Sequence, residues 1–130
     1  MKDTTVLEGF VARERAALDP YFGESDTSRY ANLFGDDATY FDPNSSGKIE
    51  GDAIQKHFAA FDGQIPPWRY DILNPSVDVR EGAAVFTFQL ETYDVGDDSV
   101  TSRWNTTEVH ARTADGWRMI HAHWSHTEPA

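Results

Sequence analysis

The chain of 130 residues contains no cysteine. This absence excludes disulfide bonds, thiol nucleophiles and zinc sites built on thiolates. Long apolar runs are missing too, because none approaches the roughly 20 residues that span a bilayer. The opening stretch MKDTTVLEGF also lacks the apolar core of a signal peptide. We therefore expect a soluble, cytoplasmic protein with no membrane partner.

Basic residues are scarce, with 11 lysines and arginines against 22 acidic residues and a formal charge of -11. Nucleic-acid affinity depends largely on neutralising phosphates, so this balance argues against a nucleic-acid partner. The chain also lacks a glycine-rich phosphate loop, a Ser-His-Asp pattern and a dinucleotide fingerprint. No cofactor is expected from these motifs.

Apolar residues make up 39% of the chain and aromatic residues 13%. Such a composition is typical of a globular protein rather than a disordered one. The length suits one domain with a single core. We predict that residues 1–130 form that one domain.

Three amphipathic helices are predicted in the first half of the chain. Apolar spacings of three and four residues indicate a helix over 3–19, with Arg13, Glu14 and Arg15 on its exposed side. A shorter helix starts near residue 25 and buries Tyr30, Leu33 and Phe34. The third covers 53–61.

The second half changes to a period of two residues, which is typical of strands. Strands are predicted over 68–80, with an interruption at Asn74 and Pro75, and over 83–94, 100–112 and 117–126, after an earlier strand at 38–42. Short connections favour hairpins, so this half reads as an antiparallel meander. Helices followed by a meander indicate an α+β fold, with the helices on one face of the sheet.

The strand over 83–94 is apolar on both sides. Phe86, Phe88 and Leu90 share one side, while Ala83 and Val85 lie on the other with Thr87. The helices can cover only one face of the sheet. The other face is therefore a candidate interface between subunits.

Four stretches together resemble a known family: ATYFDPNSSGKIEG at 38–51, ILNPSVDV at 72–79, LETYDVG at 90–96 and DGWRMIHAHWS at 115–125. They are similar to the association (hub) domain of calcium/calmodulin-dependent protein kinase II, within the nuclear transport factor 2-like and SnoaL-like superfamily. The resemblance implies a cone: a curved antiparallel sheet of about four to six strands with three N-terminal helices in its concave side. It also implies self-association through the sheet and a pocket inside the cone.

Two arginines help to make the hub pocket basic, and this chain departs from that pattern. The corresponding positions hold Gln89 and Glu108. Recognition of a carboxylate ligand would then require Arg103, on the same strand as Glu108, to take over. Trp68 is a candidate for the mouth of the pocket.

The last strand carries His121, His123 and Ser125 in step with Trp117 and Met119. This alternation predicts that all five point into the cone, with the two imidazoles about 7 Å apart. The simplest interpretation is a pair of hydrogen-bonded histidines that line a wet cavity.

A metal would need a third ligand, for which His110, Asp42 and Glu108 are possible donors. Nothing in their spacing singles them out, so no metal site is predicted.

In a catalytic interpretation His121 or His123 acts as a general base and Tyr40 donates to a developing oxyanion. The candidate carboxylate partners of the histidine are Asp42, Glu91 and Glu108. Alternatively, Asp42 only bonds to the backbone of its Asp-Pro-Asn turn. His57, on the third helix, is expected at the rim.

Three functions remain open from the sequence. The first is a stand-alone homo-oligomer of the hub type whose pocket binds a small organic molecule. The second is a small-molecule enzyme of ketosteroid isomerase, cyclase or dehydratase type. The third is a purely structural oligomer. The proposed pocket set is Tyr40, Trp68, Gln89, Arg103, Glu108 and Ser125.

Overall fold

The computed structural model describes residues 4–127. The first half contains three helices and two short strands, and the second half contains four long strands. In chain order they are α1 (Thr4–Gly23), α2 (Ser28–Ala31), β1 (Phe34–Phe41), β2 (Ile49–Glu50), α3 (Asp52–Ala59), β3 (Arg69–Arg80), β4 (Ala83–Tyr93), β5 (Val100–Thr113) and β6 (Gly116–His126). The period-two segments of the sequence all became strands within two residues of their predicted ends.

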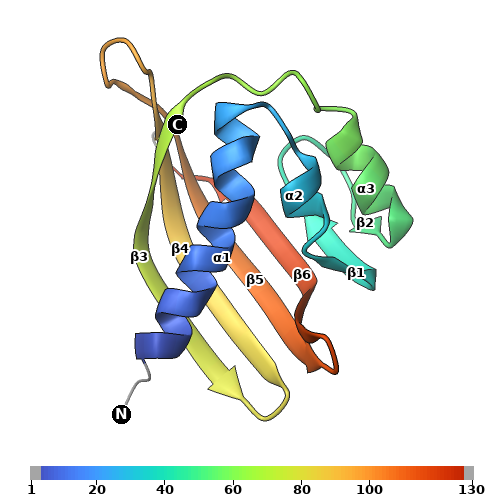
Figure 1. The fold of residues 1–130 in the computed structure, drawn as a ribbon. Coiled ribbons are helices and arrows are strands. Elements are labelled where there is room, and N and C mark those ends of the chain that lie inside the picture. Colours follow the sequence, from blue (N-terminus) through green and yellow to red (C-terminus); the bar gives the residue numbers. More distant parts are fainter. Residues whose placement is uncertain (1–3, 128–130) are drawn as a thin grey trace.

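The six strands form one curved, unclosed sheet in the order β2-β1-β6-β5-β4-β3 (Figure 1). Neighbouring strands pair antiparallel except for β1 and β6, which run parallel. The parallel pair arises because the chain passes through α3 and three further strands before β6 returns beside β1. The predicted α+β architecture is confirmed.

Register shifts bend the sheet. The β3–β4 ladder shifts between Leu73 and Ser76, at the Asn-Pro interruption, where Asn74 has φ 51°. The β5–β6 ladder shifts between Val109 and His110. An extra residue in one strand kinks that strand and increases its twist. These shifts contribute to the concave face that receives the helices.

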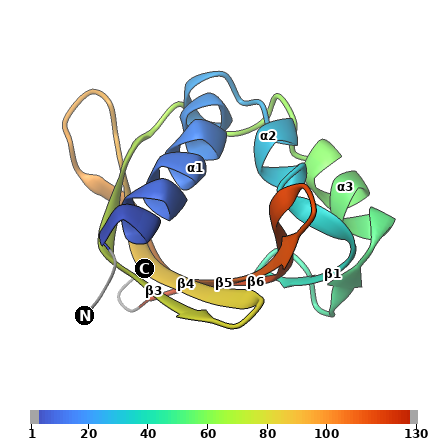
Figure 2. The same cartoon turned by 60° about the horizontal axis from the view of Figure 1, so that its bottom comes forward.

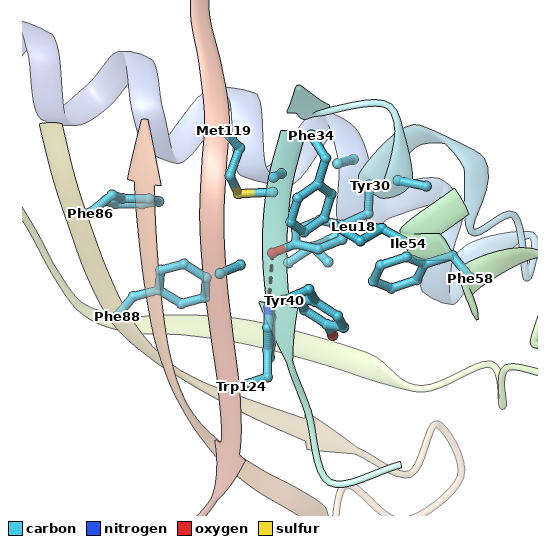
Figure 3. Close-up of a cluster of buried hydrophobic side chains, with 14 of the residues drawn as sticks. Leu18, Tyr30, Phe34, Tyr40, Ile54, Phe58, Phe86, Phe88, Met119 and Trp124 are labelled. Atoms are coloured by element: carbon cyan, nitrogen blue, oxygen red, sulfur yellow. Dashed lines mark hydrogen bonds between the residues drawn. The ribbon is translucent and has the colours of Figure 1, made fainter. Parts of the chain in front are cut away.

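Helices α1 and α2 lie across the concave face, and α3 lies beside β1 (Figure 2). Aromatic side chains fill the space between the layers (Figure 3), among them Tyr30, Phe34, Phe58, Phe86 and Trp124. Phe86, Phe88 and Leu90 are buried, as the alternation of β4 predicted. This aromatic core fixes the positions of the pocket walls.

Two helix predictions were wrong. Phe34 starts β1 instead of ending the second helix, because α2 stops after one turn and Phe34 pairs with Met119. Glu14 was assigned to the exposed side of α1 but is 1% exposed. It points at the sheet because it lies four residues after Phe10 and three before Ala17, both of which are buried.

None of the helices in the described part of the chain covers the convex face of the sheet (Figure 2). At its centre lie uncharged side chains: Val85, Thr87 and Gln89 on β4, and Asn105, Thr107 and Val109 on β5. Its charged pairs lie away from this centre, with Asp78–Arg80 on the edge strand β3 and Glu91–Arg103 near the far ends of β4 and β5. The centre of this face is therefore better suited to contact with another protein surface than most exposed sheet faces are.

Across residues 4–127, no helix has both the length and the apolar character to cross a membrane. The cytoplasmic location remains a prediction.

Candidate functional site

A pocket of about 170 Å³ opens between α1, α2, α3 and the concave face of the sheet. Aromatic and aliphatic side chains form most of its wall, and four residues add polar groups. The apolar and aromatic members are Leu18, Tyr21, Phe22, Tyr30, Tyr40, Phe58, Ile65, Pro66, Trp68, Leu90, Trp104 and Trp124; the polar ones are Asp42, Asn44, Thr92 and Ser102. Tyr40, Asp42 and Trp68 were predicted to be site residues, and all three line this pocket.

Asp42 is the acidic group of the pocket, and its side chain is only 6% exposed. Its Oδ2 lies 2.8 Å from Nε2 of His57, and its Oδ1 accepts the backbone N–H of Asn44 at 2.9 Å. The hydroxyl of Tyr40 is also hydrogen-bonded to it. The carboxylate is therefore held from three sides: its own turn, α3 and β1. Asp42 therefore accepts the expected hydrogen bond from its own turn, at Asn44, and also contacts His57 on α3.

Two tyrosines beside Asp42 keep their hydroxyl protons. Burial raises the pKa of Tyr21 to about 12, with a further contribution from the negative charge of Asp42. The pKa of Tyr40 lies well above its usual value, mainly through burial and next through the Asp42 charge. Both hydroxyls therefore act as hydrogen-bond donors at neutral pH and not as bases.

On the sheet side, a small hydroxyl network borders the pocket. Thr92 and Ser102 exchange a hydrogen bond between β4 and β5, and the indole N–H of Trp104 donates to the Ser102 hydroxyl at 2.8 Å. Thr92 is fully buried and Ser102 is 7% exposed. These partners satisfy polar groups on an otherwise apolar wall.

Behind the pocket lies a buried polar chain. Tyr30 accepts from the Trp124 indole at 2.8 Å (Figure 3) and donates to Oε2 of Glu108 at 2.8 Å. Oε1 of Glu108 lies 3.0 Å from Nε2 of His110, and the other ring nitrogen lies 3.1 Å from the guanidinium of Arg13. Arginine can only donate, so Nδ1 of His110 accepts and its proton sits on Nε2.

Glu14 touches the same chain. Burial, followed by the charge of Glu108 and a hydrogen bond to it, raises the pKa of Glu14 well above its usual value. Its Oε2 has no hydrogen-bond partner within residues 4–127. Glu108 is therefore inside the cone, as the resemblance implied, but it is occupied by Tyr30, His110 and Glu14 and does not line the pocket.

The predicted orientation of the last strand was wrong for His121, His123 and Ser125. Val109 pairs with His121 while His110 pairs with Met119, so Ile120 is an extra residue in β6. The bulge reverses the alternation. Met119 is buried, but the next inward residues are Ala122 and Trp124, and the three predicted pocket residues lie on the convex face.

On the convex face His121 and His123 flank the ring of Phe41, at centroid distances of 5.6 and 5.3 Å. The hydroxyl of Thr39 lies 2.7 Å from Nδ1 of His121. Burial, and secondly the neighbouring His123, lower the pKa of His121. These histidines have surface partners of their own and cannot reach the cavity.

Gln89 and Arg103 also lie outside the pocket. Gln89 donates to Asn105 and accepts from Asn74 across the convex face. Arg103 pairs with Glu91 through a 2.8 Å contact. Arg103 therefore does not replace the pocket arginines of the hub. Among residues 4–127 no three His, Asp or Glu side chains gather as a metal site would require.

Sequence reasoning placed His57 at the rim but missed its contact with Asp42. The Tyr40–Asp42–His57 group joins β1 to α3 across 15 residues, a distance at which no local periodicity connects them. The sequence offered one signal, because His57 directly precedes the apolar Phe58. In the structure Phe58 is buried and His57 contacts Asp42, in the turn that follows β1. For His121 and His123, the opposing signal in the sequence was that Ala122 and Trp124, which alternate with them, are apolar; these two residues are the ones that point inward.

A curved sheet that wraps around helices and encloses a mainly aromatic pocket defines a class of cone-shaped α+β proteins. The chain belongs to the SnoaL-like domain family, whose model matches residues 18–129.

Solved structures of this shape include ketosteroid isomerase-like proteins and kinase II hub domains. A candidate ketosteroid isomerase from Parabacteroides distasonis is 33% identical to the chain, with a TM-score of 0.76 and 95% and 89% of the two chains covered. The kinase II hub of S. rosetta is 23% identical, with a TM-score of 0.72 over 93% and 96%, and the C. elegans kinase II association domain shares 23% over 94% and 96%, also at 0.72. The hub likenesses show the fold alone. No curated protein matches the chain.

Proposed function

We propose that this protein binds a compact organic molecule in the cone pocket and self-associates through the convex face of its sheet. The composition of the pocket supports the first part of this proposal, the binding of a small molecule. The pocket wall is mainly aromatic, and its few polar groups come from Tyr40, Asp42 and Asn44 at the end of β1 and from Thr92 and Ser102 on the sheet. Such a combination of apolar walls and a few placed polar groups is the usual composition of a small-molecule site.

The volume limits the size of the ligand. At about 170 Å³ the pocket is smaller than the roughly 300 to 1,000 Å³ of drug-sized sites. An apolar cavity of about 150 Å³ accommodates one benzene ring. The ligand is therefore expected to contain about one ring and a short polar substituent.

The binding test uses a panel of single-ring compounds and follows the melting temperature of the protein. Binders should raise it in the wild type. Ile65 lies at the mouth and is only half-buried, so Ile65→Trp should fill the entrance without disturbing the core. The proposal fails if no compound stabilises the wild type, or if Ile65→Trp leaves the stabilisation unchanged.

The convex face supports the second part of the proposal. Its centre is uncharged and spans β4, β5 and β6, whereas charges lie at its edges. Self-association is the property that the hub domains suggest for a face of this kind. The expected assembly is a homodimer or a higher oligomer.

Light scattering after size-exclusion chromatography tests the assembly. Val109→Asp places a charge at the centre of the convex face and should produce a monomer. Val95→Asp adds the same charge on the β4–β5 connection, where Val95 is 62% exposed, and should leave the assembly intact. A wild-type monomer at micromolar concentration contradicts this part of the proposal.

A second candidate function is supported by the Asp42–His57 contact. A carboxylate that is almost fully buried, oriented by an imidazole and adjacent to a neutral tyrosine hydroxyl suits proton abstraction next to a carbonyl. Asp42 would take the proton and Tyr40 would donate to the enolate oxygen. The likeness to a candidate ketosteroid isomerase supports this alternative.

Deuterium exchange at the α-carbons of cyclohexanone in D2O, followed by NMR, tests the enzyme. Catalysis by Asp42 predicts exchange faster than in buffer, with a loss of about 100-fold or more in Asp42→Asn. Asp78→Asn removes the same charge from the exposed edge strand and should keep the rate. Exchange that is equal in wild type and Asp42→Asn excludes this role.

A further inference from the structure

The charge of the pocket wall is one-sided. Among residues 4–127, Asp42 is the only acidic residue that lines the pocket, and no lysine or arginine lines it. Arg103 is turned to the convex face, and Glu108 is occupied in the buried chain. Within the described residues, the pocket wall therefore offers an anion no lysine or arginine, and His57, which contacts Asp42, is not among the lining residues.

Eight aromatic side chains line the same pocket as this carboxylate. They are Tyr21, Phe22, Tyr30, Tyr40, Phe58, Trp68, Trp104 and Trp124. The face of an aromatic ring carries partial negative charge and attracts cations, with tryptophan the strongest. A ring of aromatic side chains with one carboxylate is the composition that recognises ammonium groups.

The carboxylate of Asp42 retains capacity for a ligand. A carboxylate offers about four acceptor positions. Asn44, His57 and Tyr40 use three of them. One position therefore remains for an N–H group of a bound molecule. The raised pKa values of Tyr21 and Tyr40 reflect in part the same negative field.

We propose that the ligand of the cone pocket is a single-ring or short-chain organic ammonium ion, held by the Asp42 carboxylate and the surrounding aromatic faces. This inference rests on the proposed function. The ammonium group lies at the Asp42 end, and the apolar part lies against Trp68 and Trp104. An organic acid of the same shape is rejected because it meets the Asp42 charge without a compensating cation.

A second cavity provides an internal control. It has a volume of about 340 Å³ and lies between the start of α1 and the β5–β6 hairpin. Arg13, Arg112 and Trp117 line it, so its charge is opposite to that of the cone pocket. Of the four tryptophans, Trp117 is the only one outside the cone pocket. Its indole signal distinguishes binding there from binding in the cone.

The test titrates the wild type with three compounds of nearly equal shape: benzylamine, benzyl alcohol and benzoate. NMR of the indole N–H groups gives the affinity and the location. Benzylamine should shift the signals of Trp68, Trp104 and Trp124 and bind at least about tenfold more tightly than benzyl alcohol. Benzoate should leave these three signals unchanged. Asp42→Asn removes the carboxylate charge, so benzylamine and benzyl alcohol should then bind with nearly equal affinity. Asp78→Asn should keep the preference for benzylamine.

The outcomes separate this inference from the function it rests on. If benzyl alcohol or benzoate binds in the cone as tightly as benzylamine, the pocket binds ligands and the ammonium inference is wrong. If none of the three compounds moves the cone tryptophans, both the inference and the binding function are overturned. The wild-type series decides these outcomes even if Asp42→Asn does not fold.

Discussion

Glu14→Gln is expected to change how the stability of the protein depends on pH. Glu14 is fully buried against Glu108, and its pKa is raised by burial and by that neighbouring carboxylate. The folded protein therefore holds a proton that the unfolded chain releases above the ordinary value of 4.5. Stability from this group is complete below that value and is lost as the pH rises toward the folded-state pKa.

The magnitude follows from linkage. One proton held only by the folded state makes the free energy of unfolding fall by about 1.4 kcal/mol per pH unit. The loss accumulates with each pH unit between the ordinary glutamate pKa and the raised pKa of Glu14. Glutamine has the same shape, carries no charge and can donate to Glu108, so the variant should lack this slope and be more stable near pH 8.

Urea unfolding followed by circular dichroism at several pH values measures the slope. Glu8→Gln is the matched control, because Glu8 lies on the exposed side of the same helix. If wild type, Glu8→Gln and Glu14→Gln give parallel profiles, the shared-proton account of the Glu14–Glu108 pair is refuted.

Three further predictions concern the turn before α3, the buried chain and the convex face. Gly51→Ala should destabilise the protein by about 1 to 2 kcal/mol in urea unfolding, because φ at Gly51 is 58° and the new Cβ would lie 3.3 Å from a backbone oxygen. Gly9→Ala is the control: Gly9 lies in a helix with open space around it, so this change should stabilise the protein by about 0.5 to 1 kcal/mol. Tyr30→Phe removes the donor to Glu108 and should cost about 1 to 3 kcal/mol in the same assay; an unchanged midpoint contradicts this. Lowering the pH from the ordinary histidine pKa toward the lowered pKa of His121 should destabilise the folded protein, because the unfolded chain binds the proton more readily, and His121→Gln should reduce this loss in urea unfolding.

Much of the fold could be predicted because its signals are local. The long strands alternate in polarity, and short hairpin connections separate them. The parallel pairing of β1 with β6 could not be read from either strand, since it depends on how the chain returns after β5. The resemblance of four stretches implied the cone but described its sheet as antiparallel, so it did not supply this parallel pair either.

The site was predicted less completely, and two residues show why. The bulge at Ile120 contains no glycine or proline, so nothing local announced it, yet it moved His121 and His123 to the opposite face of the sheet. Glu14 lies between two arginines, which made an exposed position the natural interpretation. Its spacing from Phe10 and Ala17 was the local signal for burial, but the carboxyl group that contributes to its raised pKa, Glu108, is 94 residues away in sequence.

The most direct test of the central claim is the NMR titration of the indole N–H groups with benzylamine. The account predicts that the signals of Trp68, Trp104 and Trp124 move together with one dissociation constant, while that of Trp117 stays in place. The cone pocket is not the ligand site if Trp117 alone responds, or if the cone signals remain fixed at saturating benzylamine.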